Sequence, residues 1–254
     1  MSIPTPSDSV SSVSWLVPDW PLPPGVRCLI TTRHGGASAA PYDSFNLATH
    51  VGDAASAVAA NRARLAHQLP GEPVWLEQVH GVQVVDAAAT HGVPDADASF
   101  SRQPGVVCAV MTADCLPMLF TNRAGSVVAA AHAGWRGLLA GVLEATLDAM
   151  ACPPGDVLAW LGPAISCDAF EVGAEVREAF VRQHASAASA FSPLPDGKFL
   201  ADLPQLARQR LGRAGVLMAN CFGGDACTVI ERELFFSYRR DGVTGRMASA
   251  IWLA

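Results

Sequence analysis

Three residues with metal-binding side chains lie where apolar runs of the sequence end. They are His80 in EQVHG, Cys115 in TADCLP and His132 in AAAHAGW, each ahead of a Gly or Pro turn. Because the ends of neighbouring strands in one sheet lie about 5 Å apart, these side chains converge if their strands are neighbours. Two imidazoles and one thiolate form a three-ligand set suited to zinc, with a fourth position left for water. Sulfur and imidazole donors exclude magnesium and calcium as the natural metal ions of such a site, whereas copper remains possible.

Each of the three residues also has an ordinary explanation when it is taken singly. Cysteine is among the most buried residue types, and a histidine at a strand end commonly serves as a hydrogen-bonding group. The separations of 35 and 17 residues match no compact zinc-finger pattern. Cys221 and Cys227 have no histidine nearby in the sequence and are interpreted as core thiols. The other five histidines are interpreted as ordinary hydrogen-bonding residues: His34, His50, His67, His91 and His184.

Asp114 directly precedes Cys115, and adjacent side chains on an extended strand point to opposite faces. We therefore expect Cys115 to face the metal and Asp114 to face away from it. Asp114 would then accept hydrogen bonds from backbone N–H groups at the turn, or it would orient a ligand imidazole.

The pattern of apolar residues predicts more strands than helices. Expected strands cover residues 26–33, 105–111, 116–120, 126–135, 157–161, 215–219 and 248–253, with a hairpin centred near Gly81. Expected helices cover residues 56–69, 136–150 and 171–183, and another opens at Asp202 with Pro204 in its first turn. Because strands and helices do not alternate strictly, a doubly wound parallel sheet is disfavoured. We predict an α+β fold, a single domain with a central mixed β-sheet or sandwich core flanked by helices. This domain covers residues 21–254 and follows a partly flexible segment over residues 1–20.

Composition limits the classes of function. The 254 residues are 50% hydrophobic and only 16% charged, which favours a sizeable core over solvated tails. The net charge of −6, with no basic cluster longer than Arg239-Arg240, argues against nucleic acid as a partner. The sequence has no signal-peptide pattern and no apolar run of about 18 residues, so we expect no membrane association. Seven cysteines without a disulfide-like spacing indicate reduced thiols and thus a cytoplasmic protein.

Several blocks of the sequence, taken in order, resemble one known family. They are RHGGAS, PYDSFNL, HVGD, EQVHG, TADCLPML, AAAHAGWRGLL, WLGPAI, FEVG and FFSYRRDGVTGRMASAIWL, and they extend from Arg33 to Leu253. They resemble the YfiH family, also called the laccase-domain or polyphenol-oxidase-like family. The resemblance implies that His80, Cys115 and His132 bind one zinc ion and form the catalytic centre.

The family is associated with phosphorolysis of adenosine, inosine and methylthioadenosine, together with adenosine deamination. It has also been described as a copper polyphenol oxidase, and hydrolysis of wrongly built cell-wall precursors has been proposed for some members. A multicopper laccase needs around ten histidine ligands, mostly in His-X-His motifs. This chain has seven histidines and no such motif. The zinc-deaminase signature with a Pro-Cys-X-X-Cys pair is also absent, so any deamination uses a different scaffold.

Phosphorolysis requires an anion site near the metal. The helix expected after His132 begins near Arg136, and a helix N-terminus beside an arginine suits phosphate. Arg33, at a strand end before two glycines, is a candidate for a second cation. For both arginines a structural role is the alternative. Asn46 is a candidate for hydrogen bonding to substrate on the basis of the resemblance alone. The FFSYRRDG block is interpreted as a buried aromatic strand rather than as part of a site.

The leading interpretation is a zinc-dependent purine nucleoside phosphorylase that binds a purine nucleoside and phosphate, with Zn²⁺ as cofactor and Cu²⁺ as the alternative metal. The main alternative is a cysteine- or metal-dependent amide hydrolase acting on cell-wall precursors. In its cysteine-dependent form, Cys115 is the nucleophile and His132 or His80 the base. Two further alternatives are a single-copper polyphenol oxidase and a non-enzymatic protein stabilised by zinc. The last of these predicts a fourth protein ligand, and the sequence offers only three.

Overall fold

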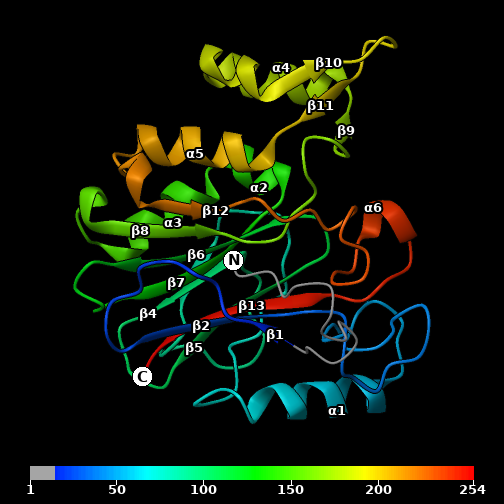
Figure 1. The fold of residues 1–254 in the computed structure, drawn as a ribbon. Coiled ribbons are helices and arrows are strands. Elements are labelled where there is room, and N and C mark those ends of the chain that lie inside the picture. Colours follow the sequence, from blue (N-terminus) through cyan, green and yellow to red (C-terminus); the bar gives the residue numbers. More distant parts are fainter. Residues whose placement is uncertain (1–14) are drawn as a thin grey trace.

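Two β-sheets lie face to face in the centre of the computed structural model, which describes residues 15–254 (Figure 1). The four-stranded sheet has the order β1 (Trp15–Leu16), β2 (Val26–Thr31), β13 (Met247–Leu253) and β5 (Val107–Thr112). The six-stranded sheet has the order β12 (Cys221–Gly223), β8 (Val157–Leu161), β6 (Leu116–Asn122), β7 (Val128–Ala133), β4 (Ala98–Ser101) and β3 (Val84–Asp86). A small third sheet has the order β10 (Phe191–Pro193), β11 (Phe199–Ala201) and β9 (Glu171–Val172).

The layer between the two large sheets is filled by apolar side chains that alternate along each strand. In β13, Ile251 lies opposite Cys28 of β2 and Cys108 of β5, and all three are buried in this layer. In β6, Leu119 packs in the same layer, whereas its neighbour Met118 packs in the core on the other side of the sheet. Two sheets packed against each other require this alternation with a period of two.

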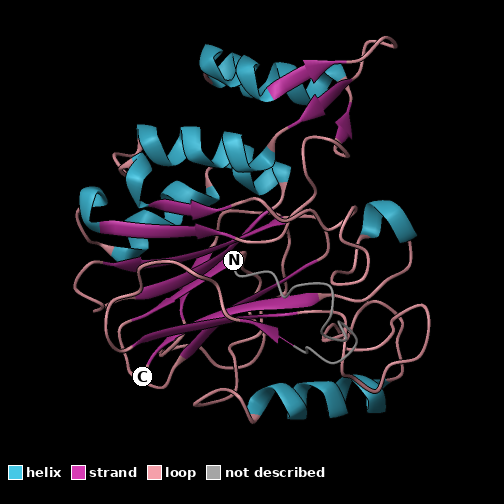
Figure 2. Ribbon diagram, in the orientation of Figure 1, coloured by secondary structure: helices cyan, strands magenta, loops and turns pink. Residues whose placement is uncertain are grey.

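Helices cover the outer faces of both sheets (Figure 2). The outer face of the six-stranded sheet packs against α2 (Trp135–Ala140), α3 (Val142–Met150) and α5 (Leu203–Arg213). The outer face of the four-stranded sheet packs against α1 (Ala55–Ala66). At the top of Figure 1, α4 (Ala174–Gln183) lies with the small sheet, and the short α6 (Tyr238–Asp241) precedes β13. Within residues 15–254, 3-10 segments cover Pro154–Asp156, Ala185–Ala190 and Met218–Asn220.

This architecture confirms the predicted α+β fold with a mixed β-sheet in a sandwich core flanked by helices. The six-stranded sheet is mixed because β3 pairs with β4 and β12 pairs with β8 in parallel, whereas its other pairs are antiparallel. The predicted start of α5 is also confirmed. Asp202 is its N-cap and accepts a hydrogen bond of 2.8 Å from the backbone N–H of Gln205, and Pro204 lies in the first turn.

The prediction of a partly flexible N-terminal segment falls mainly on residues 1–14, which lie outside the described residues. Within the described part, β1 pairs Trp15 with Thr31 and Leu16 with Ile30 of β2. The side chain of Trp20 is buried in the layer between the two large sheets.

Two predicted strand features are wrong. The hairpin around Gly81 does not form, because Glu77 instead bridges Asp95 and β3 pairs in parallel with β4. Residues that lie later in the chain therefore hold this segment, and its own two halves do not pair. The strand predicted over residues 215–219 is replaced by the 3-10 segment Met218–Asn220, and β12 follows it.

Glycines shift the boundaries of two predicted helices. The helix predicted over residues 136–150 is divided into α2 and α3 at Gly141, whose φ of 109° is readily adopted only by glycine. The helix predicted over residues 171–183 begins only after Gly173, because the two preceding residues form β9 and pair with β11.

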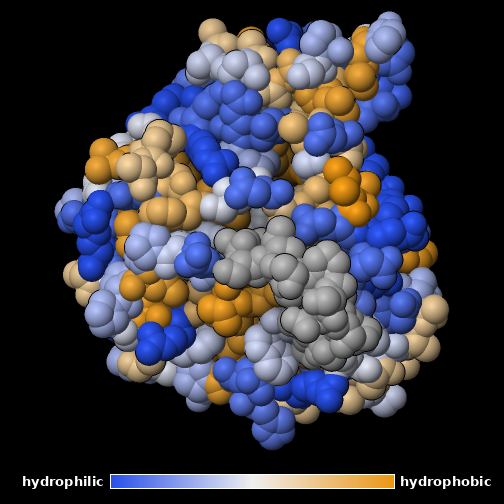
Figure 3. All heavy atoms as spheres, viewed as in Figure 1, coloured by the Kyte–Doolittle hydropathy of each residue, from blue (hydrophilic) through white to orange (hydrophobic). Residues whose placement is uncertain are grey.

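Hydrophilic and hydrophobic residues are intermixed on the face of the molecule drawn in Figure 3. Among residues 15–254, no helix combines the length and the apolar character that crossing a bilayer requires. The large hydrophobic side chains that are more than half exposed are Val17, Val79, Val93, Leu217, Ile230, Tyr238 and Val243.

The packing between the sheets predicts the cost of removing a side chain from it. Leu119 is fully buried, so Leu119→Ala should lower the free energy of unfolding by about 2–5 kcal/mol, because it leaves a cavity between two sheets that cannot close fully. Leu217, which is 53% exposed, is the matched control, and Leu217→Ala should change stability by less than about 0.5 kcal/mol. Urea-induced unfolding measures both, and equal effects would contradict the assignment of Leu119 to the core.

Candidate metal centre

The structure brings His80, Cys115 and His132 together at one end of the six-stranded sheet. One potential ligand atom from each residue lies within 4.8 Å of the other two. The Cys115 Sγ and His80 Nε2 atoms are 3.8 Å apart, and the two imidazole rings meet edge to face with centroids 4.7 Å apart. A zinc ion with its usual bond lengths would separate a thiolate sulfur and an imidazole nitrogen by about 3.6–3.8 Å. The spacing of these donors therefore suits one shared metal ion.

The pairing of β6 with β7 explains why two of the three residues meet. These strands are antiparallel neighbours in which Leu116 lies opposite Ala133 and Pro117 lies opposite His132. Cys115, immediately before β6, is therefore at the same sheet end as His132 in β7. His80 comes from a loop outside the strands, where its φ of 59° is unusual for a residue with a side chain.

A buried carboxylate, that of Asp97, holds this loop against β7. It accepts backbone hydrogen bonds from Val79 at 3.2 Å, His80 at 2.9 Å and Gly81 at 2.6 Å. It also lies 2.8 Å from Nδ1 of His132, which leaves the Nε2 atom of that ring free for a metal. Burial acts to raise the pKa of Asp97, but the hydrogen bonds from His132 and the loop outweigh burial and lower it. One carboxylate thus orients one ligand directly and a second through its backbone.

Small residues allow the three ligands to approach each other. A Cβ atom on Gly134 would lie 2.8 Å from Cδ2 of His80 and 2.9 Å from Sγ of Cys115. A Cβ atom on Gly137 would lie 3.0 Å from the carbonyl oxygen of Gly81. The GWRG segment after β7 therefore leaves room for the side chains and loop that form the site.

The charges of Cys115 and His132 stabilise each other. Burial opposes ionisation of the Cys115 thiol, but the charge of His132 and hydrogen bonds with His132 and His80 outweigh it and lower the thiol pKa to about 6. Burial likewise opposes protonation of His132, yet the Cys115 charge and the Asp97 hydrogen bond raise its pKa to about 9. Without a metal, the pair is thus a thiolate and an imidazolium near neutral pH. The thiolate is the form that binds metals.

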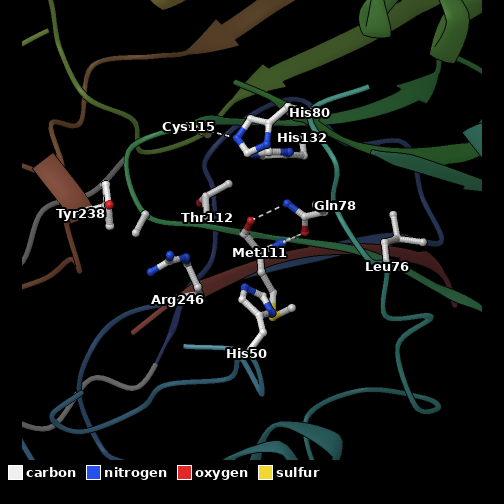
Figure 4. Close-up of a pocket in the computed structure, with 11 residues that line it drawn as sticks. His50, Leu76, Gln78, His80, Met111, Thr112, Cys115, His132, Tyr238 and Arg246 are labelled. Atoms are coloured by element: carbon white, nitrogen blue, oxygen red, sulfur yellow. Dashed lines mark hydrogen bonds between the residues drawn. The ribbon is translucent and has the colours of Figure 1, made fainter. Parts of the chain in front are cut away.

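The three donors open onto a pocket of about 390 Å³ (Figure 4). Figure 4 shows the His–Cys–His group at one end of this pocket and Arg246 with His50 toward the other. The side-chain amide of Gln78 in the pocket wall exchanges two hydrogen bonds with the backbone of Met111, at 2.7 and 2.8 Å, at the edge strand β5. The lining residues are His50, Leu76, Gln78, His80, Met111, Thr112, Ala113, Cys115, His132, Tyr238 and Arg246.

Neither arginine predicted to bind phosphate lines this pocket. Arg33 donates to the carbonyl oxygens of Asp43 and Arg232, each at 3.1 Å, and forms an ion pair with the Asp43 carboxylate at 3.3 Å. Arg136 is exposed, and its guanidinium stacks on the ring of Trp135 at 4.5 Å from the centroid. These contacts agree with a structural role for both arginines, which was the alternative to phosphate binding.

Asn46, predicted to contact substrate, is fully buried and also lies outside the pocket lining. Its amide nitrogen donates to the carbonyl oxygen of Ala48 at 3.1 Å and to the Asp53 carboxylate at 3.0 Å. Its amide oxygen accepts from the backbone N–H of Arg246 at 2.9 Å. Asn46 is therefore connected to the pocket by its hydrogen bond to the backbone of Arg246, which is a lining residue.

Asp114 does not contact a ligand imidazole. Its carboxylate accepts a hydrogen bond from the Thr228 hydroxyl at 2.6 Å and another from the backbone N–H of Arg239 at 2.6 Å. It therefore holds α6 near the site. The imidazole-orienting role considered for Asp114 belongs to Asp97.

Sequence reasoning missed four residues at the site. His50 was interpreted as an ordinary hydrogen-bonding residue, and Tyr238 was placed in a buried strand, whereas it begins α6 and is 60% exposed. Asp97 and Arg246 were not singled out. The local sequence around Asp97, VPDADASF, carries no signal of its role, because all the hydrogen-bond partners of its carboxylate lie at least 16 residues away.

The pKa values of the two paired ligands predict how metal binding depends on pH. Between about pH 6 and pH 9, a metal must displace the proton of His132, so its apparent affinity should rise about tenfold per pH unit. Below about pH 6 Cys115 must also lose a proton, and the dependence should steepen. Zinc titrations against a competing chelator, together with the protons released per metal, measure this. An affinity that stays constant across this range would contradict the thiolate–imidazolium pair.

The position of Asp97 predicts the effect of removing its charge. Asp97→Asn should lower zinc affinity about 10–100-fold, because it weakens the hold on His132 and on the His80 loop. The matched control is Asp95→Asn, an exposed aspartate two residues away, which should leave the affinity unchanged. Chelator competition on folded variants measures both, and a normal affinity in Asp97→Asn would refute this role.

Comparison with known proteins agrees with the resemblance in the sequence. The family described as "Multi-copper polyphenol oxidoreductase laccase" matches residues 27–254. The chain is 59% identical over 241 residues to a protein of Escherichia coli named purine nucleoside phosphorylase YfiH, covering 94% of this chain and 98% of that one. A crystal structure of a Neisseria meningitidis protein superposes with a TM-score of 0.91 at 57% identity, covering 94% and 99% of the two chains. The structure of YlmD from Geobacillus stearothermophilus superposes with a TM-score of 0.86 at 32% identity, covering 94% and 96%. The chain therefore belongs to the YfiH family, the laccase-like family that this match describes.

Proposed function

We propose that this protein is a zinc-dependent purine nucleoside phosphorylase that acts on adenosine, inosine and methylthioadenosine, with adenosine deamination as a second reaction. The observation that carries the proposal is the His80–Cys115–His132 group at the wall of a pocket of about 390 Å³. This volume lies in the range of sites that enclose small molecules. The names of the YfiH relatives supply the reaction class.

The donor set supports one zinc ion per chain. Two imidazoles and a thiolate suit zinc, and three protein ligands leave a fourth position open, as catalytic zinc sites do. Within the described residues, the only group of three or more potential ligands is His80, Cys115 and His132. One such group does not support the multi-copper chemistry in the family's description, although a single copper ion fits the same donors.

Phosphorolysis forms a bond between a phosphate oxygen and C1′ of the ribose while the bond from C1′ to the purine N9 breaks. The electron pair stays on the purine, which takes up the proton of hydrogen phosphate. A bound zinc would supply a Lewis acid and a water of lowered pKa at this position. Tyr238, at the pocket rim, offers an aromatic face to the purine, and the apolar side chains of Leu76 and Met111 limit the access of water.

The main alternative is an amide hydrolase in which Cys115 is the nucleophile. The low pKa of Cys115, about 6, and its pairing with His132 favour this alternative in a metal-free protein. The two mechanisms differ in what chelation does. Chelation removes the activity of a zinc enzyme together with its metal. An enzyme with a cysteine nucleophile stays active after chelation, and its Cys115 thiolate, no longer bound to metal, can then be alkylated.

Substitution of the thiolate ligand tests the proposal. Cys115→Ser should abolish both zinc retention and cleavage of inosine, because a neutral hydroxyl is a poor zinc ligand. Cys167→Ser is the matched control, since Cys167 is an exposed free thiol outside the pocket, and it should keep metal and activity. Metal content and phosphate-dependent release of hypoxanthine are measured on the same preparations. Full turnover by metal-free Cys115→Ser would refute the proposal.

A further inference from the structure

Arg246 is a cation of the pocket with no carboxylate partner among the described residues. The ion pairs of residues 15–254 involve other cationic side chains, although Arg246 is half-buried. Burial lowers the pKa of its guanidinium, and the charges of Cys115 and Asp114 act in the opposite direction. A partly desolvated guanidinium usually has a compensating anion. The pocket is where such an anion has room to bind.

The backbone around Arg246 is held firmly. Asn46, itself fully buried, accepts from the N–H of Arg246, and the carbonyl oxygen of Arg246 accepts from the N–H of Leu47 at 3.3 Å. A Cβ atom on Gly245 would lie 2.8 Å from Cβ of Asn46 and 2.7 Å from the ring of Phe236. Only glycine therefore permits this close contact. The position from which the Arg246 side chain enters the pocket is fixed before a ligand binds.

The side chain of Arg246 is oriented as well. Its Nη1 donates to the carbonyl oxygens of Thr244 and Gly245, each at 3.0 Å. Its guanidinium carbon lies 5.9 Å from the centroid of the Tyr238 ring. No described residue accepts a hydrogen bond from Nε or Nη2 of Arg246, so the guanidinium edge that these two nitrogens form is available to a ligand. A guanidinium edge matches two oxygens of a phosphate.

The position of Arg246 relative to the metal ligands suits a reaction between two substrates. Figure 4 shows Arg246 across the pocket from Cys115 and His132, with His50 on its own side. Arg246 and Cys115 both line this pocket. An anion on Arg246 would therefore lie in the same pocket as a nucleoside held near the metal ligands.

We propose that Arg246 anchors an oxyanion subsite that binds inorganic phosphate, with His50 as a second donor. The inference rests on the proposed phosphorolysis, because that reaction requires phosphate beside the nucleoside. It assigns to Arg246 the role that the sequence suggested for Arg33 and Arg136. Asn46 becomes a positioning residue, which acts on phosphate through the backbone of Arg246.

Equilibrium binding of inorganic phosphate to the zinc-loaded protein tests the subsite without turnover. Arg246→Gln should weaken phosphate binding about 10–100-fold, as expected when a charged hydrogen-bond donor is lost. Arg246→Lys keeps the positive charge but lacks the paired N–H donors of a guanidinium, so it should weaken phosphate binding less than Arg246→Gln does. It replaces Arg246→Gln in the test if that variant does not fold. The matched control is Arg136→Gln, which removes an exposed arginine outside the pocket and should bind phosphate normally.

Kinetics separate this inference from the proposed function. In Arg246→Gln or Arg246→Lys, the KM for phosphate should rise while the KM for inosine and the zinc content stay close to those of the wild type. Unchanged phosphate affinity in both variants, or an equal loss in Arg136→Gln, overturns the subsite even where inosine is cleaved. If the protein cleaves no nucleoside but binds phosphate in a way that depends on Arg246, the subsite is upheld and the proposed function is overturned. A zinc-loaded wild type that binds no phosphate overturns the subsite.

Discussion

The site depends on one buried carboxylate, that of Asp97. Its four hydrogen bonds connect a loop to a strand, because three come from the backbone of residues 79–81 and one comes from the His132 ring. The loop places His80 in a backbone conformation that a residue with a side chain rarely adopts. The hydrogen bonds of Asp97 offset the cost of that conformation. The same carboxylate selects which nitrogen of His132 is free, so the geometry of two ligands depends on a residue that is not itself a ligand.

Local chemistry explains which parts of this structure were predictable from sequence. Cys115 and His132 end two apolar runs, and those runs are the antiparallel neighbours β6 and β7, so the expectation that they meet was correct. Asp202 and Pro204 likewise mark the start of α5 through contacts within one turn. One misprediction has a local cause, because Gly141 divides the helix predicted over residues 136–150. Other features that the sequence did not indicate depend on contacts between residues farther apart in the chain. The Gly81 turn is held by Asp97, and Tyr238 reaches the pocket because Asp114 holds α6. Arg33 forms an ion pair with Asp43 outside the pocket lining, which its place in the sequence did not indicate.

The pocket has chemically different groups at its two ends. At one end, two imidazoles and a thiolate form a set of soft donors whose charges favour a metal ion over a proton as pH rises. At the other end, Arg246 donates from Nη1 to two backbone carbonyl oxygens, and no residue in the described part of the chain accepts from its Nε or Nη2. A purine nucleoside phosphorylase needs both features, because it must activate a nucleoside and present phosphate to it. Neither a multi-copper oxidase nor a purely structural zinc site requires this combination.

The central claim is that one metal ion on His80, Cys115 and His132 is required for nucleoside cleavage. The most direct test follows a single preparation of the wild-type protein through chelation and reconstitution, with metal content and phosphate-dependent inosine cleavage measured at each stage. The account predicts about one zinc ion per chain, loss of activity with the metal, and recovery in proportion to the zinc restored. Activity that survives complete removal of the metal, or that returns only with copper, would contradict it.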